Sequence, residues 1–201
     1  MKWLLVYRSK QLGLAWKKYF DAQDDVEVLE GDICRVPCDA VVSPANSFGF
    51  MDGGLDYHLS ERFGWDLQDR LQAKIANRPV KELLVGEALL IPTQDAEVPW
   101  LIAAPTMRVP MRLRQTVNAY LAMKAILSSA LAHTAQPAIK KVAVPGLGTG
   151  CGALSSETAA LQMWRAYEEV VLKKVIYPED FGEAQKRHIY MNIDEINLWD
   201  P

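Results

Sequence analysis

The chain has 201 residues, half of them hydrophobic, so it can bury a sizeable core and fits one domain over residues 1–201. Its formal net charge is −3 with the Lys and Arg residues dispersed, which excludes a broad basic surface for nucleic acid and leaves any anionic ligand to local groups. No run approaches the roughly 20 apolar residues of a membrane span, and the opening MKWLLVY is too short for a secretory signal.

Strands and helices alternate in the first half of the sequence. We expect a strand over 2–7, a helix over 10–20 that Ser9 caps, and strands over 25–31 and 39–45. After a loop, an apolar side chain recurs at every fourth position, which predicts one amphipathic helix from Gly54 to about Ile75. The residues of this stripe are Leu55, Leu59, Phe63, Leu67, Leu71 and Ile75.

The second half continues the alternation. We expect strands over 87–93, 100–106, 140–146 and 188–194, with helices over 114–132 and 155–174. The strand over 100–106 is almost continuously apolar, as a strand covered on both faces would be. The pattern predicts an α/β fold with helices on both faces of a mixed sheet, a three-layer α/β/α sandwich.

Cysteines and histidines give no sign of a metal site. The three cysteines are an odd, sparse set without a CxxC pair, which suits a reducing cytoplasm better than a disulfide framework. The three histidines, His58, His133 and His188, show no metal-ligand spacing. We therefore expect a cytoplasmic protein that uses neither a metal nor a cofactor.

Two glycine-rich segments stand where predicted strands give way to helices. They cover residues 48–54 and 145–157. Ligands of open α/β sheets gather at such junctions, and two of these loops could clamp a diphosphate through backbone N–H groups without lysine. The second loop lacks the Lys-Ser/Thr of a P-loop, and its GxGxxA match lacks an acid about 20 residues on. A tight strand-to-helix turn remains the alternative for it.

Four short segments, in this order and spacing, resemble the macro domain, an ADP-ribose-binding α/β/α module. They are EGDIC at 30–34, VVSPAN at 41–46, GGLD at 53–56 and PGLGTG at 145–150. The resemblance covers roughly residues 25–175. The amino-acid sequences of the two loops are similar to those of a bacterial or phage-associated branch of the family.

The resemblance implies an ADP-ribose site. In it, Asp32 accepts a hydrogen bond from the adenine amino group, and the backbone N–H of Ile33 meets a ring nitrogen. Taken alone, without the resemblance, Asp32 is a turn residue after Gly31. The other ligand-binding residues that the resemblance implies are Asn46, Gly53, Gly54, Leu55, Gly146, Leu147, Gly148, Thr149, Gly150 and Cys151. Cys151 is also read as a loop thiol, because no histidine is close to it in sequence.

Asn46 and Asp56 are the candidate catalytic residues. They are ten positions apart, the separation found in the hydrolytic branch that the chain resembles, where the Asp helps activate a water that attacks C1″ of the distal ribose. Alternatively, Asn46 is a turn residue whose side chain is hydrogen-bonded within the turn, and Asp56 is an acidic residue that the helix dipole favours in the first turn of a helix. Met51 and Asp52 replace two glycines found in many hydrolytic members.

Further departures leave the activity open. The family usually has an aromatic residue beside the distal ribose, and this chain has none near Gly152. Either Phe48 or Phe50 supplies that stacking surface from the first loop, or these phenylalanines pack into the core. A local basic cluster, Arg108, Arg112 and Arg114, either reaches a phosphate or forms a solvated loop. The resemblance implies an ADP-ribosyl hydrolase, an ADP-ribose reader or a hydrolase of O-acetyl-ADP-ribose. The expected partner is ADP-ribose or an ADP-ribosylated protein or nucleic acid, without a membrane.

Overall fold

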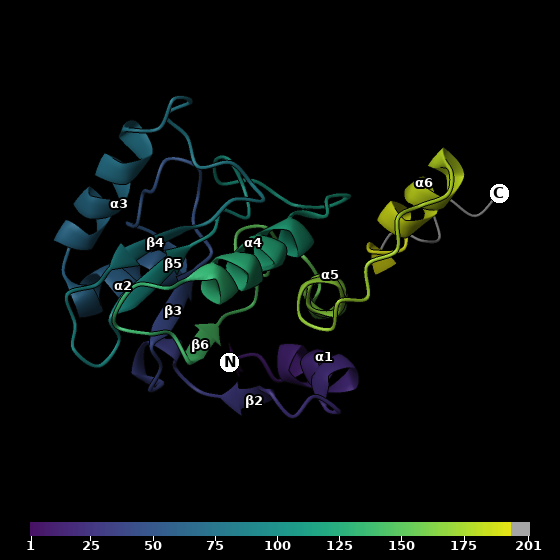
Figure 1. The fold of residues 1–201 in the computed structure, drawn as a ribbon, viewed down its shortest axis with the longest axis horizontal. Coiled ribbons are helices and arrows are strands. Elements are labelled where there is room, and N and C mark those ends of the chain that lie inside the picture. The colour runs from purple at the N-terminus through teal and green to yellow at the C-terminus, as the bar shows by residue number, and fades with distance from the viewer. Residues whose placement is uncertain (194–201) are drawn as a thin grey trace.

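A six-stranded mixed sheet forms the middle of the protein in a computed structural model that describes residues 1–193 (Figure 1). The strand order is β2-β1-β6-β3-β5-β4, and all neighbours are parallel except β4, which runs antiparallel to β5. The strands are β1 (Lys2–Tyr7), β2 (Val26–Glu30), β3 (Ala40–Ser43), β4 (Leu89–Pro92), β5 (Trp100–Ala103) and β6 (Lys141–Val144).

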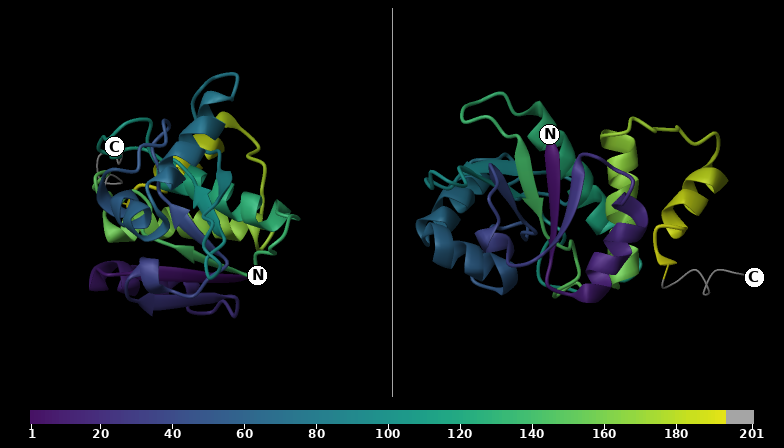
Figure 2. Two further views of the ribbon diagram at one scale, coloured as in Figure 1. Left: turned by 90° about the vertical axis from the view of Figure 1, so that its left-hand side faces the viewer. Right: turned by 90° about the horizontal axis from the view of Figure 1, so that it is seen from below.

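Helices cover both faces of this sheet, which confirms the predicted three-layer sandwich (Figure 2). One face carries α1 (Lys10–Phe20), α4 (Asn118–Ala132) and α5 (Ser156–Val170), with α5 packed against both others. The other carries the short 3-10 helix η1 (Ile33–Arg35), α2 (Gly54–Phe63) and α3 (Asp66–Ala76).

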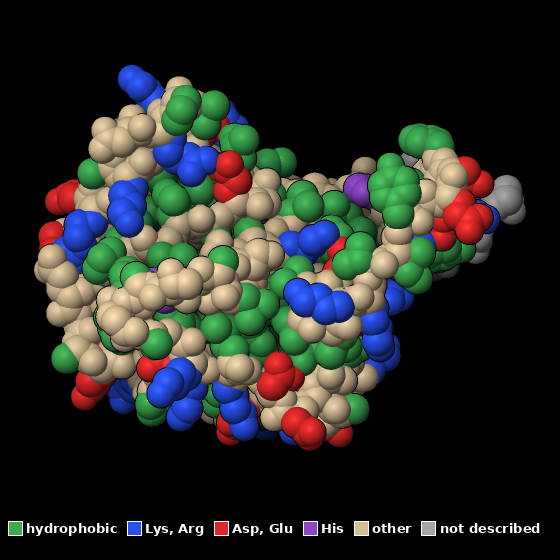
Figure 3. Space-filling model, in the orientation of Figure 1, with side chains coloured by type: hydrophobic (Ala, Val, Ile, Leu, Met, Phe, Trp, Pro, Cys, Tyr) green, Lys and Arg blue, Asp and Glu red, His purple; other side chains and the backbone are tan. Residues whose placement is uncertain are grey.

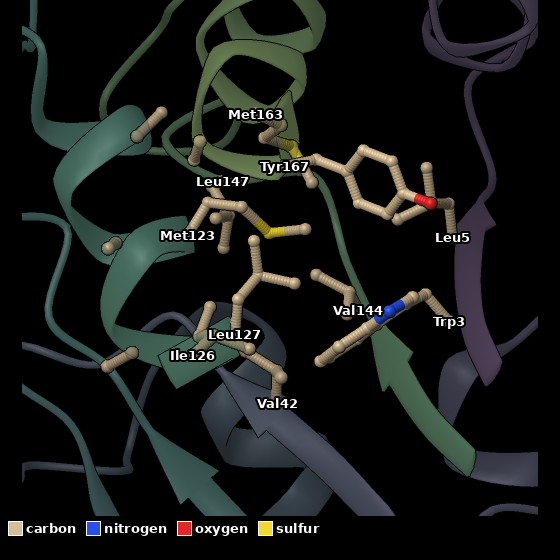
Figure 4. Close-up of a cluster of buried hydrophobic side chains, with 14 of the residues drawn as sticks. Trp3, Leu5, Val42, Met123, Ile126, Leu127, Val144, Leu147, Met163 and Tyr167 are labelled. Atoms are coloured by element: carbon tan, nitrogen blue, oxygen red, sulfur yellow. The ribbon is translucent and has the colours of Figure 1, made fainter. Parts of the chain in front are cut away.

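The central strands are buried on both faces because successive side chains point in opposite directions. In β1, Trp3 and Leu5 join the core beneath α1, α4 and α5, whereas Leu4 and Val6 join the core beneath α2 and α3. Figure 4 shows the first of these cores, where residues of β1, β3 and β6 meet Met123, Ile126 and Leu127 of α4. This double burial holds the strand ends, and the loops that follow them, in fixed relative positions.

The prediction of one helix over 54–75 was wrong. Gly64, with a φ of +89°, ends α2, and α3 begins at Asp66. Only glycine adopts that backbone conformation readily, so the break is encoded in the sequence. The apolar stripe continues across it because both helices place their apolar residues, such as Leu59 and Leu67, against the same core.

The strand predicted over 188–194 was also wrong. His188 and Ile189 end a helix, α6 (Phe181–Ile189), whose capping Asp180 side chain accepts a 2.7 Å hydrogen bond from the Glu183 N–H. Residue 194 lies outside the described residues. Figures 1 and 2 show α6 beyond α5, away from the sheet. The remaining predicted elements form, with ends that differ by a few residues.

On the face that Figure 3 shows, Lys and Arg side chains are interspersed with Asp and Glu. Among the described residues, no helix is long and apolar enough to cross a membrane.

Candidate functional site

Three loops leave the same edge of the sheet, at the carboxyl ends of neighbouring parallel strands. Residues 31–33 follow β2, the first glycine-rich loop follows β3, and the second follows β6. Since β1 lies between β2 and β6, and β6 pairs directly with β3, the second glycine-rich loop lies between residues 31–33 and the first glycine-rich loop along this edge. Open α/β sheets bind ligands at such an edge. We call these three loops, with the ends of their strands, the candidate site.

Asp32 stands at one end of the candidate site, as the capping residue of η1. Its Oδ1 accepts a 3.1 Å hydrogen bond from the Cys34 N–H, and its Oδ2 lies 3.0 Å from Nη2 of Arg8. Partial burial acts to raise the pKa of Asp32, but the Cys34 N–H and Arg8 together hold it below its usual value. The carboxylate is therefore ionised at neutral pH and acts as an acceptor. The neighbouring Ile33 side chain is buried.

Arg8 is a component of the candidate site that the sequence analysis does not single out. It directly follows β1, which pairs in parallel with β2, and the Gly31 N–H donates a 2.9 Å hydrogen bond to the Tyr7 carbonyl. This bond brings the residues that follow, Arg8 and Asp32, close together beyond the ends of the two strands. A rule that looks for charged residues after every predicted strand would have found Arg8.

Asn46 closes the first loop with its side chain. Its Oδ1 accepts hydrogen bonds from the N–H groups of Phe48 and Phe50 at 3.1 and 3.3 Å, and its Nδ2 donates to the Phe50 carbonyl at 2.8 Å. The loop is also tied at Met51, whose N–H donates to the Gln68 side chain of α3 at 2.7 Å. In this conformation Asn46 acts as a turn residue, which was the alternative reading of it.

Asp56 lies in the first turn of α2 and is 8% exposed. Oδ1 of its carboxyl accepts a 2.7 Å hydrogen bond from the hydroxyl of Ser43, the last residue of β3. Burial raises the pKa of Asp56 to about 6, and the Ser43 hydroxyl acts in the opposite direction. A carboxyl with this pKa can both accept and release a proton near neutral pH. Ser43, like Arg8, was not anticipated from the sequence, because a serine at a strand end gives no specific signal.

The second loop is partly a packing element. Leu147 is fully buried, and Figure 4 shows its side chain in the core beside Met123. Thr149 is half-buried and donates a 3.3 Å hydrogen bond to the Gly146 carbonyl, whereas Gly150 and Cys151 are exposed. The loop is therefore buried at Leu147 and exposed to solvent at its tip, Gly150 and Cys151.

The predicted glycines fall into two groups. A Cβ added to Gly146 or Gly148 would lie 2.6 or 2.9 Å from a leucine side chain, so the core itself requires glycine there. A Cβ added to Gly53, Gly54 or Gly150 would meet no described atom within 4 Å. Packing therefore does not explain why Gly53 and Gly150 are glycines. Backbone conformation does not explain it either, because φ at both positions is outside the left-handed region. These positions leave room for a ligand close to the backbone.

A pocket of about 550 Å³ adjoins the second loop between the amino ends of α1 and α5. Thr149 is the predicted ligand-binding residue on its wall, so the pocket extends from one side of the candidate site. Its described lining consists of Ser9, Gln11, Leu12, Thr149, Leu154, Ser155, Ser156 and Glu157.

The two phenylalanines of the first loop differ. Phe48 is half-buried beneath the Arg108 guanidinium, 5.0 Å from the ring centroid, and Arg108 is also paired with Glu82 at 2.7 Å. Phe50 is 54% exposed. Of the two, Phe50 is free to supply a stacking surface. In the described part of the chain, no three His, Cys, Asp or Glu side chains are grouped so that they could hold a metal ion.

The chain matches a known protein family and relatives in other organisms. The family model "Macro domain" matches residues 42–163, which include Asn46, Asp56 and the second loop and begin after Asp32. An uncharacterised protein of Aquifex aeolicus is 34% identical over 155 residues, which are 76% of this chain and 88% of that protein.

Solved structures share the fold. The Oceanobacillus iheyensis macrodomain with ADP has a TM-score of 0.59 at 16% identity, over 83% of this chain and 90% of that one. The Thermosipho africanus DarTG in complex with ADP-ribose has a TM-score of 0.56 at 17% identity, over 86% of this chain and 54% of that one.

Proposed function

This chain belongs to the macro domain family, and we propose that it binds ADP-ribose at the candidate site and hydrolyses ADP-ribosyl linkages on a macromolecule. The observation that carries the proposal is the placement of Asp32 and the open Gly53 and Gly150 along one sheet edge. From β2 to β3 this edge extends over three strand spacings, about 14 Å, which suits an elongated ligand. Asp32 takes the adenine amino group, and the two glycine loops take the diphosphate and distal ribose through their N–H groups.

Asp56 is the proposed general base of the hydrolysis. The oxygen of a water molecule bonds to C1″ of the distal ribose while the bond from C1″ to the acceptor breaks. Asp56 takes a proton from the water, and the acceptor leaves with the electron pair of the broken bond and takes a proton from solvent. A pKa of about 6 leaves Asp56 mostly ionised at pH 7 and above, as a base must be.

A reader function is the second candidate, and the state of Asn46 favours it. Both polar atoms of its amide are engaged within the first loop, and Asp56 is almost fully buried. A domain that only binds ADP-ribose needs neither group to reach the distal ribose. A hydrolase of O-acetyl-ADP-ribose would use the same groups as the proposed enzyme with a small acceptor.

A release assay distinguishes these functions. The full chain is incubated with proteins ADP-ribosylated on Glu, Asp, Ser or Arg, with ADP-ribosylated nucleic acid, and with O-acetyl-ADP-ribose. The proposed function predicts release of ADP-ribose from at least one macromolecular substrate. Release from O-acetyl-ADP-ribose alone supports the metabolite hydrolase, and binding without any release supports the reader.

The proposal extends to the rest of the chain and to its location. We propose that residues 1–201 form a single macro domain, because β1 and β2 complete the sheet of the segment that matches the family. A cytoplasmic location is supported by the free thiols of Cys34, Cys38 and Cys151.

A further inference from the structure

Arg8 is a cation at the candidate site that the proposed function does not use. The strands fix the place of its backbone, since Tyr7, the last residue of β1, accepts a hydrogen bond from Gly31, and Arg8 and Asp32 directly follow these two residues. The juxtaposition of Arg8 and Asp32 therefore follows from the register of β1 and β2.

The Arg8 side chain is more exposed than the Asp32 carboxylate that it contacts. The Arg8 side chain is 69% exposed and that of Asp32 is 34% exposed. Oδ1 of Asp32 is engaged by the Cys34 N–H, while Oδ2 is the oxygen that faces Arg8. The guanidinium is therefore accessible to a ligand that binds at Oδ2 of Asp32.

Simple geometry places the guanidinium against such a ligand. An amino group that donates to Oδ2 has its nitrogen about 3 Å from that oxygen. Nη2 of Arg8 is 3.0 Å from the same oxygen. Two nitrogens that share one acceptor in this way are no more than about 6 Å apart, so the guanidinium can reach the ring that carries the amino group.

We propose that Arg8 contacts the base of the bound nucleotide and is a further binding residue of the site. The inference rests on the proposed binding of ADP-ribose. A guanidinium is planar and packs against the flat face of a nucleobase while it keeps an N–H on a carboxylate. The adjacent aromatic residue does not take this role, because the Tyr7 ring lies over Gly13 of α1, where an added Cβ would be 2.4 Å from Cζ.

Calorimetry with AMP and with ADP-ribose tests the inference in the full chain. Arg8→Ala should weaken both ligands by the same factor, about 3–10-fold, because the lost contact is with the base that they share. Arg35→Ala is the matched control. Nε of Arg35 is 4.0 Å from the same Oδ2 and its side chain is 87% exposed, so its loss removes an equal charge and should change affinity less than about twofold.

Arg8→Lys separates the planar group from its charge. Arg8→Lys should bind both ligands almost as weakly as Arg8→Ala does, since an ammonium group keeps the charge but lacks the planar guanidinium. Arg8→Ala should also weaken AMP in an Asp32→Ala background, because the contact is with the base itself. Unchanged or tighter binding by Arg8→Ala, an equal loss in Arg35→Ala, full recovery in Arg8→Lys, or no effect in the Asp32→Ala background would each overturn the inference. Failure of the wild type to bind ADP-ribose would instead overturn the proposed function.

Discussion

The hydroxyl of Ser43, at the end of β3, donates a 2.7 Å hydrogen bond to Oδ1 of Asp56, in the first turn of α2. This bond joins the sheet to the helix behind the first loop. It also supplies a hydrogen-bond donor to Asp56, which is only 8% exposed. A buried carboxyl of this kind affects both stability and catalysis, and the two effects can be measured separately.

Asp56 should make the protein less stable as the pH rises. Burial raises its pKa from an unfolded value of 3.8 to about 6, so the folded state holds the proton more tightly than the unfolded state does. The resulting stabilisation is fully present below about pH 4 and is lost as the pH rises through about 6, a change of about 3 kcal/mol. Urea unfolding of the wild type and Asp56→Asn between pH 4 and 8 measures it. The variant should lack this component, and identical pH dependence in the two proteins would contradict the assignment.

Turnover should depend on the same group. Asp56→Asn should lower hydrolysis of ADP-ribosyl linkages by about 10²–10⁴-fold, because an amide cannot take the proton of the attacking water. ADP-ribose affinity should change little, and wild-type activity should rise with pH through about 6 as Asp56 ionises. Single-turnover assays beside calorimetry check this. Asp52→Asn, at an exposed neighbouring acid, is the control; equal losses in both variants would remove Asp56 from the mechanism.

Asp32 should account for the recognition of adenine. Asp32→Ala is expected to weaken AMP and ADP-ribose alike by about 1–3 kcal/mol, since it removes a charge-assisted hydrogen bond to the base. Ribose 5-phosphate, which has no base, should be unaffected. Competition of these compounds against a fluorescent ADP-ribose analogue gives the affinities. If Asp32→Ala binds AMP as the wild type does, adenine is held elsewhere.

The two groups of glycines should respond differently to a side chain. Gly150→Val should bind ADP-ribose at least tenfold more weakly at nearly unchanged stability, because the added atoms occupy open space at the candidate site. Gly148→Val should lose about 1–3 kcal/mol of stability, since Gly148 has a φ of +73° and an added Cβ would be 2.9 Å from Leu154. Thermal unfolding and calorimetry on both variants test this contrast. Full affinity in Gly150→Val would place the ligand away from the second loop.

The sequence was sufficient for the layers of the fold because the relevant signals are local. Short apolar runs identified β1, β3 and β6, and glycine-rich segments after β3 and β6 located the two loops of the candidate site. The signal for α6 was also local but was not used: Asp180 and Glu183 form a capping pair three residues apart. Such a pair predicts a helix where alternation suggested a strand.

Contacts across the sheet could not be predicted in the same way. That Arg8 lies beside Asp32 depends on β1 taking the place between β2 and β6, a property of strand order that no local pattern encodes. The bond from Ser43 to Asp56 likewise depends on how α2 packs on β3. Asn46 follows the end of β3 by three residues, and its engagement within the first loop depends on the loop conformation.

Calorimetric titration of the full wild-type chain with ADP-ribose and with AMP tests the central claim most directly. The proposed site binds adenine at Asp32 and the diphosphate and distal ribose at the glycine loops, so both halves of ADP-ribose should contribute. We predict one-to-one binding of ADP-ribose that is at least tenfold tighter than that of AMP. Binding of ADP-ribose no tighter than AMP, or no binding of either, would contradict the account.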